Sequence, residues 1–199
     1  MTNPLQRKGP LDHLGLAARA DTAGENGIHL TALPVPQIIE LRGAWSDAFA
    51  SAVHQTLGVN IPTASPDTAK GGGLTVFWMG PDRWWLVGDG IVLPSVNELR
   101  QKLAAFNAAA VETGDAFAAV EIAGPNARDA LAKGCMIDLH PRVFQSGSVV
   151  QTNLAKVQIT LYQSDEMTYQ IFARRSFAEY LWTWLEDAGV EYGVSIKFI

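Results

Sequence analysis

The chain has 199 residues and a formal net charge of −5, and it contains no cluster of lysines and arginines. Because an acidic chain of this kind gains no counterion-release energy on DNA or RNA, we expect no nucleic-acid partner. No apolar run approaches the roughly 20 residues that a membrane-spanning helix needs, so we expect no membrane partner. The single cysteine, Cys135, cannot form an internal disulfide, which fits a cytoplasmic protein.

Apolar periodicity and turn residues divide the first half of the chain into elements. In chain order they are an N-terminal arm (1–27), two short strands (28–43), a helix (45–58), a loop (60–73), a β-hairpin (74–88) and a second helix (95–109). Pro34 and Pro36 separate the two strands, because proline cannot donate to a central ladder. Ser95 and Glu98 form a capping box at the start of the second helix.

The second half repeats this order. It predicts a strand (116–124), a short helix (125–134), a connecting loop, an antiparallel strand pair (149–163 and 167–175), a helix (176–189) and a final strand (192–199). Pro125 stands at the start of the short helix and Gly134 past its end, the usual asymmetry of helix termini. Ser176 and Glu179 predict a cap for the longer helix.

Each half therefore reads strand, helix, strand, strand, helix, strand, which is the split βαβ order of a ferredoxin-like unit. We predict an α+β fold of two tandem ferredoxin-like lobes with antiparallel sheets and packed helices. The arm covers residues 1–27, and a single domain covers residues 28–199. Its two lobes span about 28–115 and 116–199.

Motifs for catalysis are weak throughout the sequence. The glycine-rich segments near Lys70 and Gly88 lack the remaining residues of a P-loop or a dinucleotide fingerprint, and no nucleophile elbow occurs. Residues 135–142 collect a thiol, a carboxylate, an imidazole and a guanidinium. Zinc usually needs about four ligands in paired spacings, and the C-terminal side of a helix disfavours a thiolate at Cys135. We therefore expect an inert loop in which Asp138 caps backbone amides and the apolar residues reach the core. No catalytic, cofactor-binding or metal-binding residue is predicted.

Tryptophan is the unusual feature of the composition: six occur, more than a core of this size usually holds, and tryptophan favours protein interfaces. Trp84 and Trp85 are adjacent in a strand and must face opposite sides, so one can be core while the other meets a second sheet, a helix or a partner. In the helix 176–189, Tyr180 and Trp184 can point away from its apolar face. These four residues are the candidate partner interface.

Several segments resemble a known family. They are LTVFWMGPDRWWLVG, then GPNARDALAKGC, DLHPRVF and QTNLAKV in that order, and then YQIFARRSFAEYLWTWLEDAG. Together they resemble the gamma subunit of bacterial heterotetrameric sarcosine oxidase, from about Pro81 to Gly193. The ordered series between residues 124 and 157 is the most specific part.

The resemblance implies a fold related to the folate-binding fold of glycine-cleavage aminomethyltransferases. It also implies a non-catalytic subunit that serves assembly and stability, with alpha, beta and delta subunits as partners. The complex would demethylate sarcosine oxidatively to glycine and pass the one-carbon unit to tetrahydrofolate. FAD, FMN, NAD, zinc and tetrahydrofolate are expected on the partner subunits. Related complexes act on other N-methyl amino acids, so the amine stays open.

Two alternatives also stay open. One is a folate-dependent one-carbon transferase that acts alone, although the chain is short and no carboxylate maps onto the catalytic position of those enzymes. The other is a stand-alone folate-fold regulator or maturation factor, which the sequence Lys133-Gly134-Cys135 suggests. The MIDLH that follows departs from the pattern of those factors.

Overall fold

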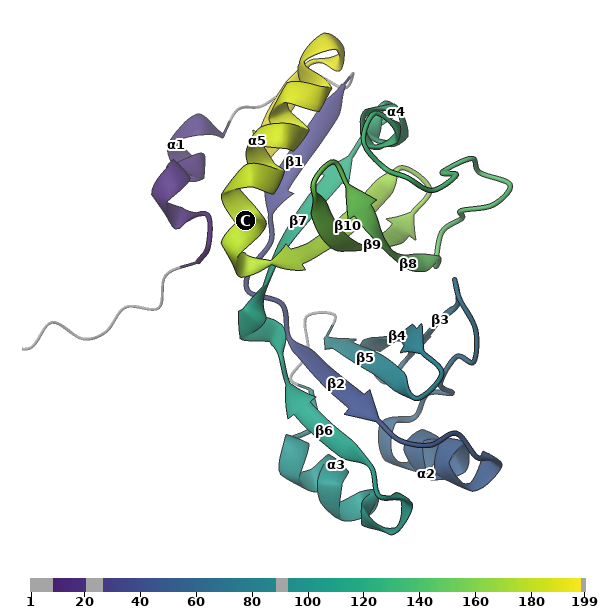
Figure 1. Ribbon diagram of the computed structural model, residues 1–199. Coiled ribbons are helices and arrows are strands. Elements are labelled where there is room, and N and C mark those ends of the chain that lie inside the picture. The colour runs from purple at the N-terminus through teal and green to yellow at the C-terminus, as the bar shows by residue number, and fades with distance from the viewer. Residues whose placement is uncertain (1–8, 21–26, 89–92, 198–199) are drawn as a thin grey trace, which may run out of the picture.

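The computed structural model describes residues 9–20, 27–88 and 93–197, which fold into two β-sheets flanked by helices (Figure 1). The helices are α1 (Leu16–Arg19), α2 (Asp47–Leu57), α3 (Val96–Lys102), α4 (Ala127–Ala132) and α5 (Ala178–Gly189). The strands are β1 (Ile28–Ala32), β2 (Ile38–Arg42), β3 (Thr68–Gly71), β4 (Leu74–Gly80), β5 (Arg83–Gly88), β6 (Ala109–Glu112), β7 (Phe117–Ala123), β8 (Val149–Leu154), β9 (Val157–Asp165), β10 (Thr168–Arg174) and β11 (Val194–Lys197). Single 3₁₀ turns cover Asp12–Leu14, Ala104–Phe106, Gly114–Ala116, Arg175–Phe177 and Val190–Tyr192.

Within the described residues, sheet A has six strands in the order β11-β1-β7-β10-β9-β8, and sheet B has five in the order β3-β4-β5-β2-β6. Paired strands are antiparallel except β1 and β11, which run parallel. The predicted α+β class with antiparallel sheets is confirmed.

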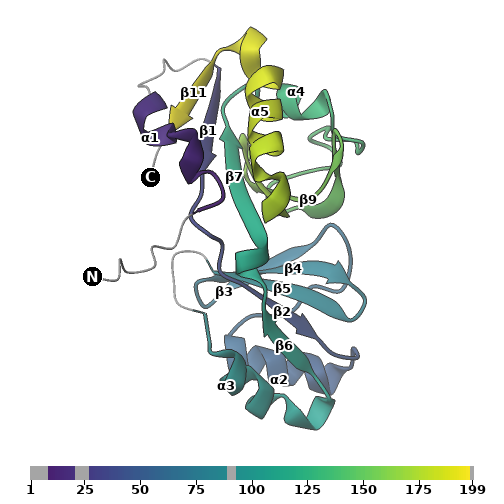
Figure 2. The ribbon, with the colours of Figure 1, turned by 60° about the vertical axis from the view of Figure 1, so that its left-hand side comes forward.

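The molecule is built in four layers, with helices outside and the two sheets packed face to face (Figures 1 and 2). One apolar core joins α2 and α3 to the outer face of sheet B, and another joins α4 and α5 to the outer face of sheet A. A third cluster lies between the sheets and is rich in aromatic rings, including Phe77, Trp85 and Phe172. Strand alternation produces this division, because successive side chains point to opposite faces of a sheet.

Two chain segments connect the sheets. Residues 33–37 lead from β1 in sheet A to β2 in sheet B, and residues 113–116 lead from β6 in sheet B back to β7 in sheet A. The strand expected to open the first lobe, residues 28–32, therefore lies in the sheet of the second half. In sheet A this strand, β1, pairs antiparallel with β7. In sheet B the corresponding neighbour of β2 is β6. Local alternation predicts a strand but does not specify its partner, so this placement depends on tertiary pairing.

The described residues contain three more strands than predicted. One is β6 (Ala109–Glu112), which begins where a helix was predicted to end and pairs with β2. Thr68–Gly71, in the predicted loop, forms β3. This strand lies at the edge of sheet B and pairs antiparallel with β4. The run 149–163, predicted as one strand, is a hairpin of β8 and β9 that turns at Ala155, where φ is 51°. Neither β3 nor the hairpin carries a usual signal, since β3 is polar and the turn at Ala155 lacks glycine.

The N-terminal segment is attached to the domain. Leu11 and Leu16 are buried in the core beneath α5, with exposed fractions of 5% and 4%. His13 Nε2 lies within hydrogen-bond distance of Glu179 Oε2, at 3.1 Å, and Arg19 forms an ion pair with Glu186. Both glutamates belong to α5. Residues 9–20 therefore pack beside α5 and β11 (Figure 2), although the sequence shows only an arm there.

The helix caps test the residues singled out in the sequence. The Ser95 hydroxyl accepts a hydrogen bond from Glu98 N at 3.2 Å, as predicted, and Gly58 ends α2 with φ at 69°. The cap predicted at Ser176 is wrong: a 3₁₀ turn holds Ser176, and α5 begins after Phe177 without a side-chain cap. Among the helices in the described ranges, none has the length and apolar character that a bilayer crossing requires.

Candidate functional site

The segment after α4 that collects Cys135, Asp138, His140 and Arg142 is a surface loop. Asp138 Oδ1 accepts from His140 N at 2.8 Å, and His140 Nδ1 accepts from Arg142 N at 3.2 Å. These contacts close the turn, as the prediction for Asp138 requires. No group of three metal-ligating side chains occurs within the ranges that the structure describes.

The Cys135 thiol is half-buried beside the β8–β9 hairpin, where its backbone bridges to Leu154. Burial raises the pKa of this thiol, which favours the protonated form. The nucleophilic form is the thiolate, so the surroundings of Cys135 do not activate it.

The apolar residues of the same loop divide between core and surface. Leu139 and Phe144 are buried, as predicted, whereas Met136 and Val143 are 78% and 59% exposed. The prediction that all of them reach the core is wrong for these two, because a surface loop has room for only some of its side chains against the core.

Trp84 and Trp85 face opposite sides of β5, and both are buried. Trp84 packs beneath α2 and donates from Nε1 to Pro62 O at 2.8 Å. Trp85 faces sheet A, where its ring lies 4.7 Å from that of Phe117 between centroids. With exposed fractions of 0% and 4%, neither indole offers a surface to another chain, so the interface prediction is wrong for this pair. Helix α2 covers Trp84, and sheet A covers the face of Trp85 that a partner could have covered.

Tyr180 and Trp184 lie four residues apart on α5, and they therefore share one side of the helix. Tyr180 is 41% exposed. Trp184 is partly buried, with its indole lying over Gly134: a Cβ at that glycine would lie 2.5 Å from Trp184 Cζ2. Met136, two residues after Gly134 in the sequence, is 78% exposed. Their role as a partner interface stays a prediction.

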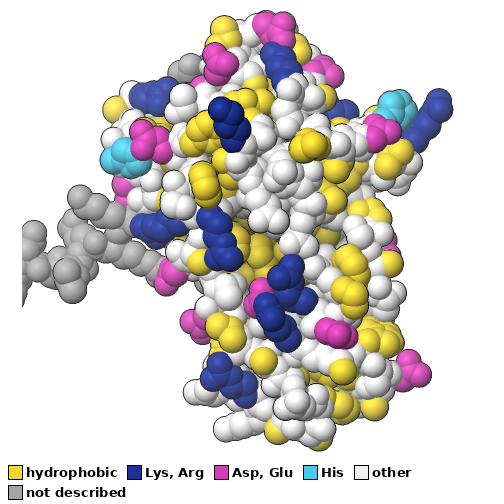
Figure 3. All heavy atoms as spheres, in the orientation of Figure 1, with side chains coloured by type: hydrophobic (Ala, Val, Ile, Leu, Met, Phe, Trp, Pro, Cys, Tyr) yellow, Lys and Arg dark blue, Asp and Glu magenta, His cyan; other side chains and the backbone are white. Residues whose placement is uncertain are grey.

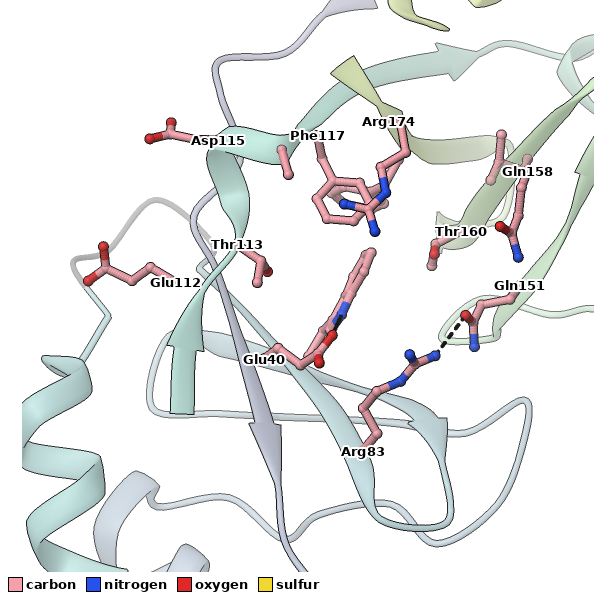
Figure 4. Close-up of a pocket in the computed structure, with 14 residues that line it drawn as sticks. Glu40, Arg83, Glu112, Thr113, Asp115, Phe117, Gln151, Gln158, Thr160 and Arg174 are labelled. Carbon is pink, nitrogen blue, oxygen red and sulfur yellow. Dashed lines mark hydrogen bonds between the residues drawn. The ribbon is translucent and has the colours of Figure 1, made fainter. Parts of the chain in front are cut away.

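A cavity of about 490 Å³ opens between the two sheets (Figure 4). Its wall is aromatic, formed by Trp85 of sheet B with Phe117 and Phe172 of sheet A. Arg83 enters from the start of β5, and Arg174 enters from the end of β10. No sequence motif marks this site, because its residues come from separate strands that meet only when the sheets pack.

The polar groups of the cavity are arranged around these rings. Arg83 Nη2 donates to Gln151 Oε1 at 3.0 Å and to Met79 O at 3.1 Å. Glu40 accepts from Arg42 Nε at 2.6 Å and from Trp85 Nε1 at 3.3 Å. Neither cysteine nor histidine occurs among the described lining residues.

The comparison with protein families decides the identity. A family model described as the sarcosine oxidase, gamma subunit family matches residues 42–191. The chain belongs to this family. The resemblance in the segments between residues 74 and 189 is thereby confirmed.

Curated relatives match over nearly their whole length. A sarcosine oxidase subunit gamma from Corynebacterium sp. (strain U-96) is 29% identical over 192 residues, covering 95% of this chain and 93% of the relative. One from Arthrobacter sp. is 28% identical over 191 residues, covering 94% of this chain and 91% of the relative.

Two solved structures extend the comparison. The heterotetrameric sarcosine oxidase from Corynebacterium sp. U-96, in complex with pyrrole 2-carboxylate, contains a chain that matches with a TM-score of 0.83 and 29% identity. The match covers 93% of the present chain and 95% of that one. The glycine cleavage system aminomethyltransferase T from Bartonella henselae matches with a TM-score of 0.66 and 13% identity, covering 96% of the present chain and 58% of that one. The second likeness shows a shared fold, as the resemblance implied.

Proposed function

We propose that this gamma-family chain is the non-catalytic gamma subunit of a heterotetrameric sarcosine oxidase-type complex with alpha, beta and delta subunits. Its role is to assemble and stabilise that complex. The observation that carries the proposal is the TM-score of 0.83 over 93% of the chain to a subunit of such a heterotetramer. The match extends over nearly the whole of both chains, so the fold of that subunit is shared from end to end.

The reaction assigned to the complex is the oxidative demethylation of sarcosine to glycine, with transfer of the one-carbon unit to tetrahydrofolate. FAD, FMN, NAD, zinc and tetrahydrofolate are placed on the partner subunits, as the family resemblance implies. The complex is placed in the cytoplasm, where the unpaired thiol of Cys135 stays reduced.

The partner-facing surface is proposed at Tyr180 and Trp184 of α5, continued by Met136. An aromatic side chain that is 41% exposed and a methionine that is 78% exposed cost solvation energy in an isolated chain. Burying them against another subunit recovers that energy, and aromatic and methionine side chains are enriched in interface cores.

Co-expression with the alpha, beta and delta genes tests the complex. The tagged chain should retain all three partners through size-exclusion chromatography, and sarcosine-dependent peroxide formation should follow the assembled peak. The chain alone should neither oxidise sarcosine nor carry flavin absorbance. Sarcosine oxidation by the chain alone, or its failure to copurify with any partner, would reject the proposal.

The double variant Tyr180→Ala/Met136→Ala tests the surface. Both side chains are exposed, so the unfolding midpoint should stay close to that of the wild type while partner retention falls at least about tenfold. Val111→Ala is the control, because Val111 is 49% exposed on β6 of the other sheet. Equal retention by the double variant and the control would place the interface elsewhere.

A further inference from the structure

Two guanidinium groups enter the cavity between the sheets from opposite sides. Arg174 projects from sheet A and Arg83 from sheet B, and both side chains extend into the space between them in Figure 4. Among the described residues, neither arginine forms an ion pair with a carboxylate. Arginines in a concave site without a paired anion form a positive, hydrogen-bonding surface.

Arg174 is held in place by packing against a ring. Its Cζ lies 4.7 Å from the centroid of the Phe117 ring, a cation–π contact. The guanidinium carries five N–H groups, which can still donate to a ligand while its Cζ lies over the ring. An arginine stacked in this way is oriented before a ligand arrives, so less side-chain entropy is lost on binding.

Arg83 is oriented by hydrogen bonds from one nitrogen. Nη2 donates to both Met79 O and Gln151 Oε1, which fixes the plane of the guanidinium. The remaining donors are free for a further acceptor, since a guanidinium carries five N–H groups. The two arginines therefore both keep donors for an anion.

Three carboxylates line the cavity together with the two arginines, and each has a position that Figure 4 shows. Glu40 is engaged by Arg42 Nε and by the indole of Trp85. Glu112 and Asp115 lie on the opposite side of the cavity from Arg83, and their side chains extend away from Arg174 (Figure 4). On the surface, Lys and Arg side chains border the hollow between the lobes, with Asp or Glu side chains among them (Figure 3).

The shape of the cavity limits the size and type of ligand. Its volume of about 490 Å³ lies within the range of small-molecule sites. The Trp85 and Phe117 rings meet at 66° with centroids 4.7 Å apart, and Phe172 lies beside them at 6.3 Å from Trp85. Aromatic walls of this kind favour a flat, apolar ligand body.

We propose that this inter-sheet cavity is a binding site for a small planar carboxylate. The carboxylate lies between Arg83 and Arg174, and the flat part of the molecule packs against Trp85 and Phe117. The site belongs to this chain alone and does not depend on the proposed role in the complex. The same carboxylate chemistry could come from a free organic acid or from an Asp or Glu side chain of a partner subunit.

Benzoate is the probe for this site, and benzamide is its uncharged counterpart of the same shape. The full chain, labelled with ¹⁵N, is titrated with each compound at low ionic strength. Benzoate should shift the indole N–H signal of Trp85 and amide signals of β5 and β10 in a saturable way, with benzamide binding at least about tenfold more weakly. Equal affinity for both compounds, or benzoate shifts spread outside the cavity, would overturn the proposal.

Arg174→Gln is the decisive variant, because Arg174 is exposed and its removal leaves the hydrogen bonds of Arg83 intact. It should weaken benzoate binding at least about tenfold, since a charge-assisted contact is lost. Arg142→Gln changes the net charge equally on the surface loop after α4 and should leave the affinity unchanged. Equal weakening by both variants would show a nonspecific charge effect and reject the site.

The assembled complex distinguishes the two sources of the carboxylate. If a free acid is the natural ligand, the complex binds benzoate as the chain does. If a partner side chain fills the cavity, the chain binds benzoate and the complex does not, and Arg174→Gln then also weakens partner retention. In both cases the existence of the site is decided by the benzoate affinity of the chain alone.

Discussion

Gly114 lies directly against the carbonyl oxygen of Pro36, where the two connections between the sheets pass each other. A side chain at position 114 would occupy the position of that oxygen and would also crowd Ile38 N at 3.2 Å. The two connections, residues 33–37 and 113–116, are at least 76 positions apart in the sequence. The contact explains how they are held side by side at the junction of the sheets. Only glycine fits there without movement of the backbone.

We therefore expect Gly114→Ala to destabilise the domain. A backbone oxygen cannot rotate away as a flexible side chain can, so the cost should be about 1–3 kcal/mol or more. Urea denaturation followed by tryptophan fluorescence measures the change. Gly114→Ser should cost at least as much, and unchanged midpoints for both variants would show that the crossing relaxes freely.

Leu16→Ala should destabilise the domain through the N-terminal segment. Leu16 is 4% exposed and belongs to the core beneath α5, so its truncation leaves a cavity that costs about 2–4 kcal/mol. The neighbouring Ala17 is exposed, and Ala17→Ser should change stability by less than about 0.5 kcal/mol. Equal midpoints for Leu16→Ala and wild type would mean that residues 9–20 do not contribute to the core.

Trp84→Phe should reduce stability without affecting partner binding. The substitution removes the donor to Pro62 O and leaves space beside Phe49, which together should cost about 2 kcal/mol. Trp45→Phe is the matched control, because Trp45 lies next to the Trp84 ring but is 43% exposed. Loss of partner retention by folded Trp84→Phe would contradict the assignment of Trp84 to the core.

The pKa of Cys135 predicts a specific pH dependence. Burial raises the pKa of this thiol in the folded state. Its contribution to stability is therefore complete below the ordinary thiol pKa of about 8.5 and is lost as the pH rises through the raised value, because the unfolded chain ionises first. Urea midpoints of wild type should fall more between pH 7 and pH 9.5 than those of Cys135→Ala. Identical declines would show that the thiol is not shifted.

Local patterns in the sequence predicted most elements correctly where each had its own signal. The helix 45–58 was predicted from apolar spacing and ended at Gly58, and Ser95 was identified as a cap from its spacing to Glu98; both are confirmed. The strand Thr68–Gly71 and the turn at Ala155 were missed, because edge pairing and hairpin closure supplied what composition did not. The cap at Ser176 was predicted from spacing alone, but a 3₁₀ turn replaces it.

The candidate sites divide in the same way. The opposite orientation of Trp84 and Trp85 follows from strand alternation, but their burial required the second sheet. The cavity with Arg83 and Arg174 could not be predicted, since its two arginines are 91 positions apart and no local pattern brings them together. Their separation in the chain says nothing about their separation in space.

The sequence by itself determined the element types of most segments, the α+β class and the resemblance to a family, because these depend on neighbouring residues and their order. Tertiary structure alone decided that β1 joins the sheet of the second half, that residues 9–20 pack on α5, and that two arginines and three aromatic rings meet between the sheets. The physical reason is that strand pairing and face-to-face packing are set by which surfaces bury each other, and a local pattern specifies an apolar face without specifying what covers it.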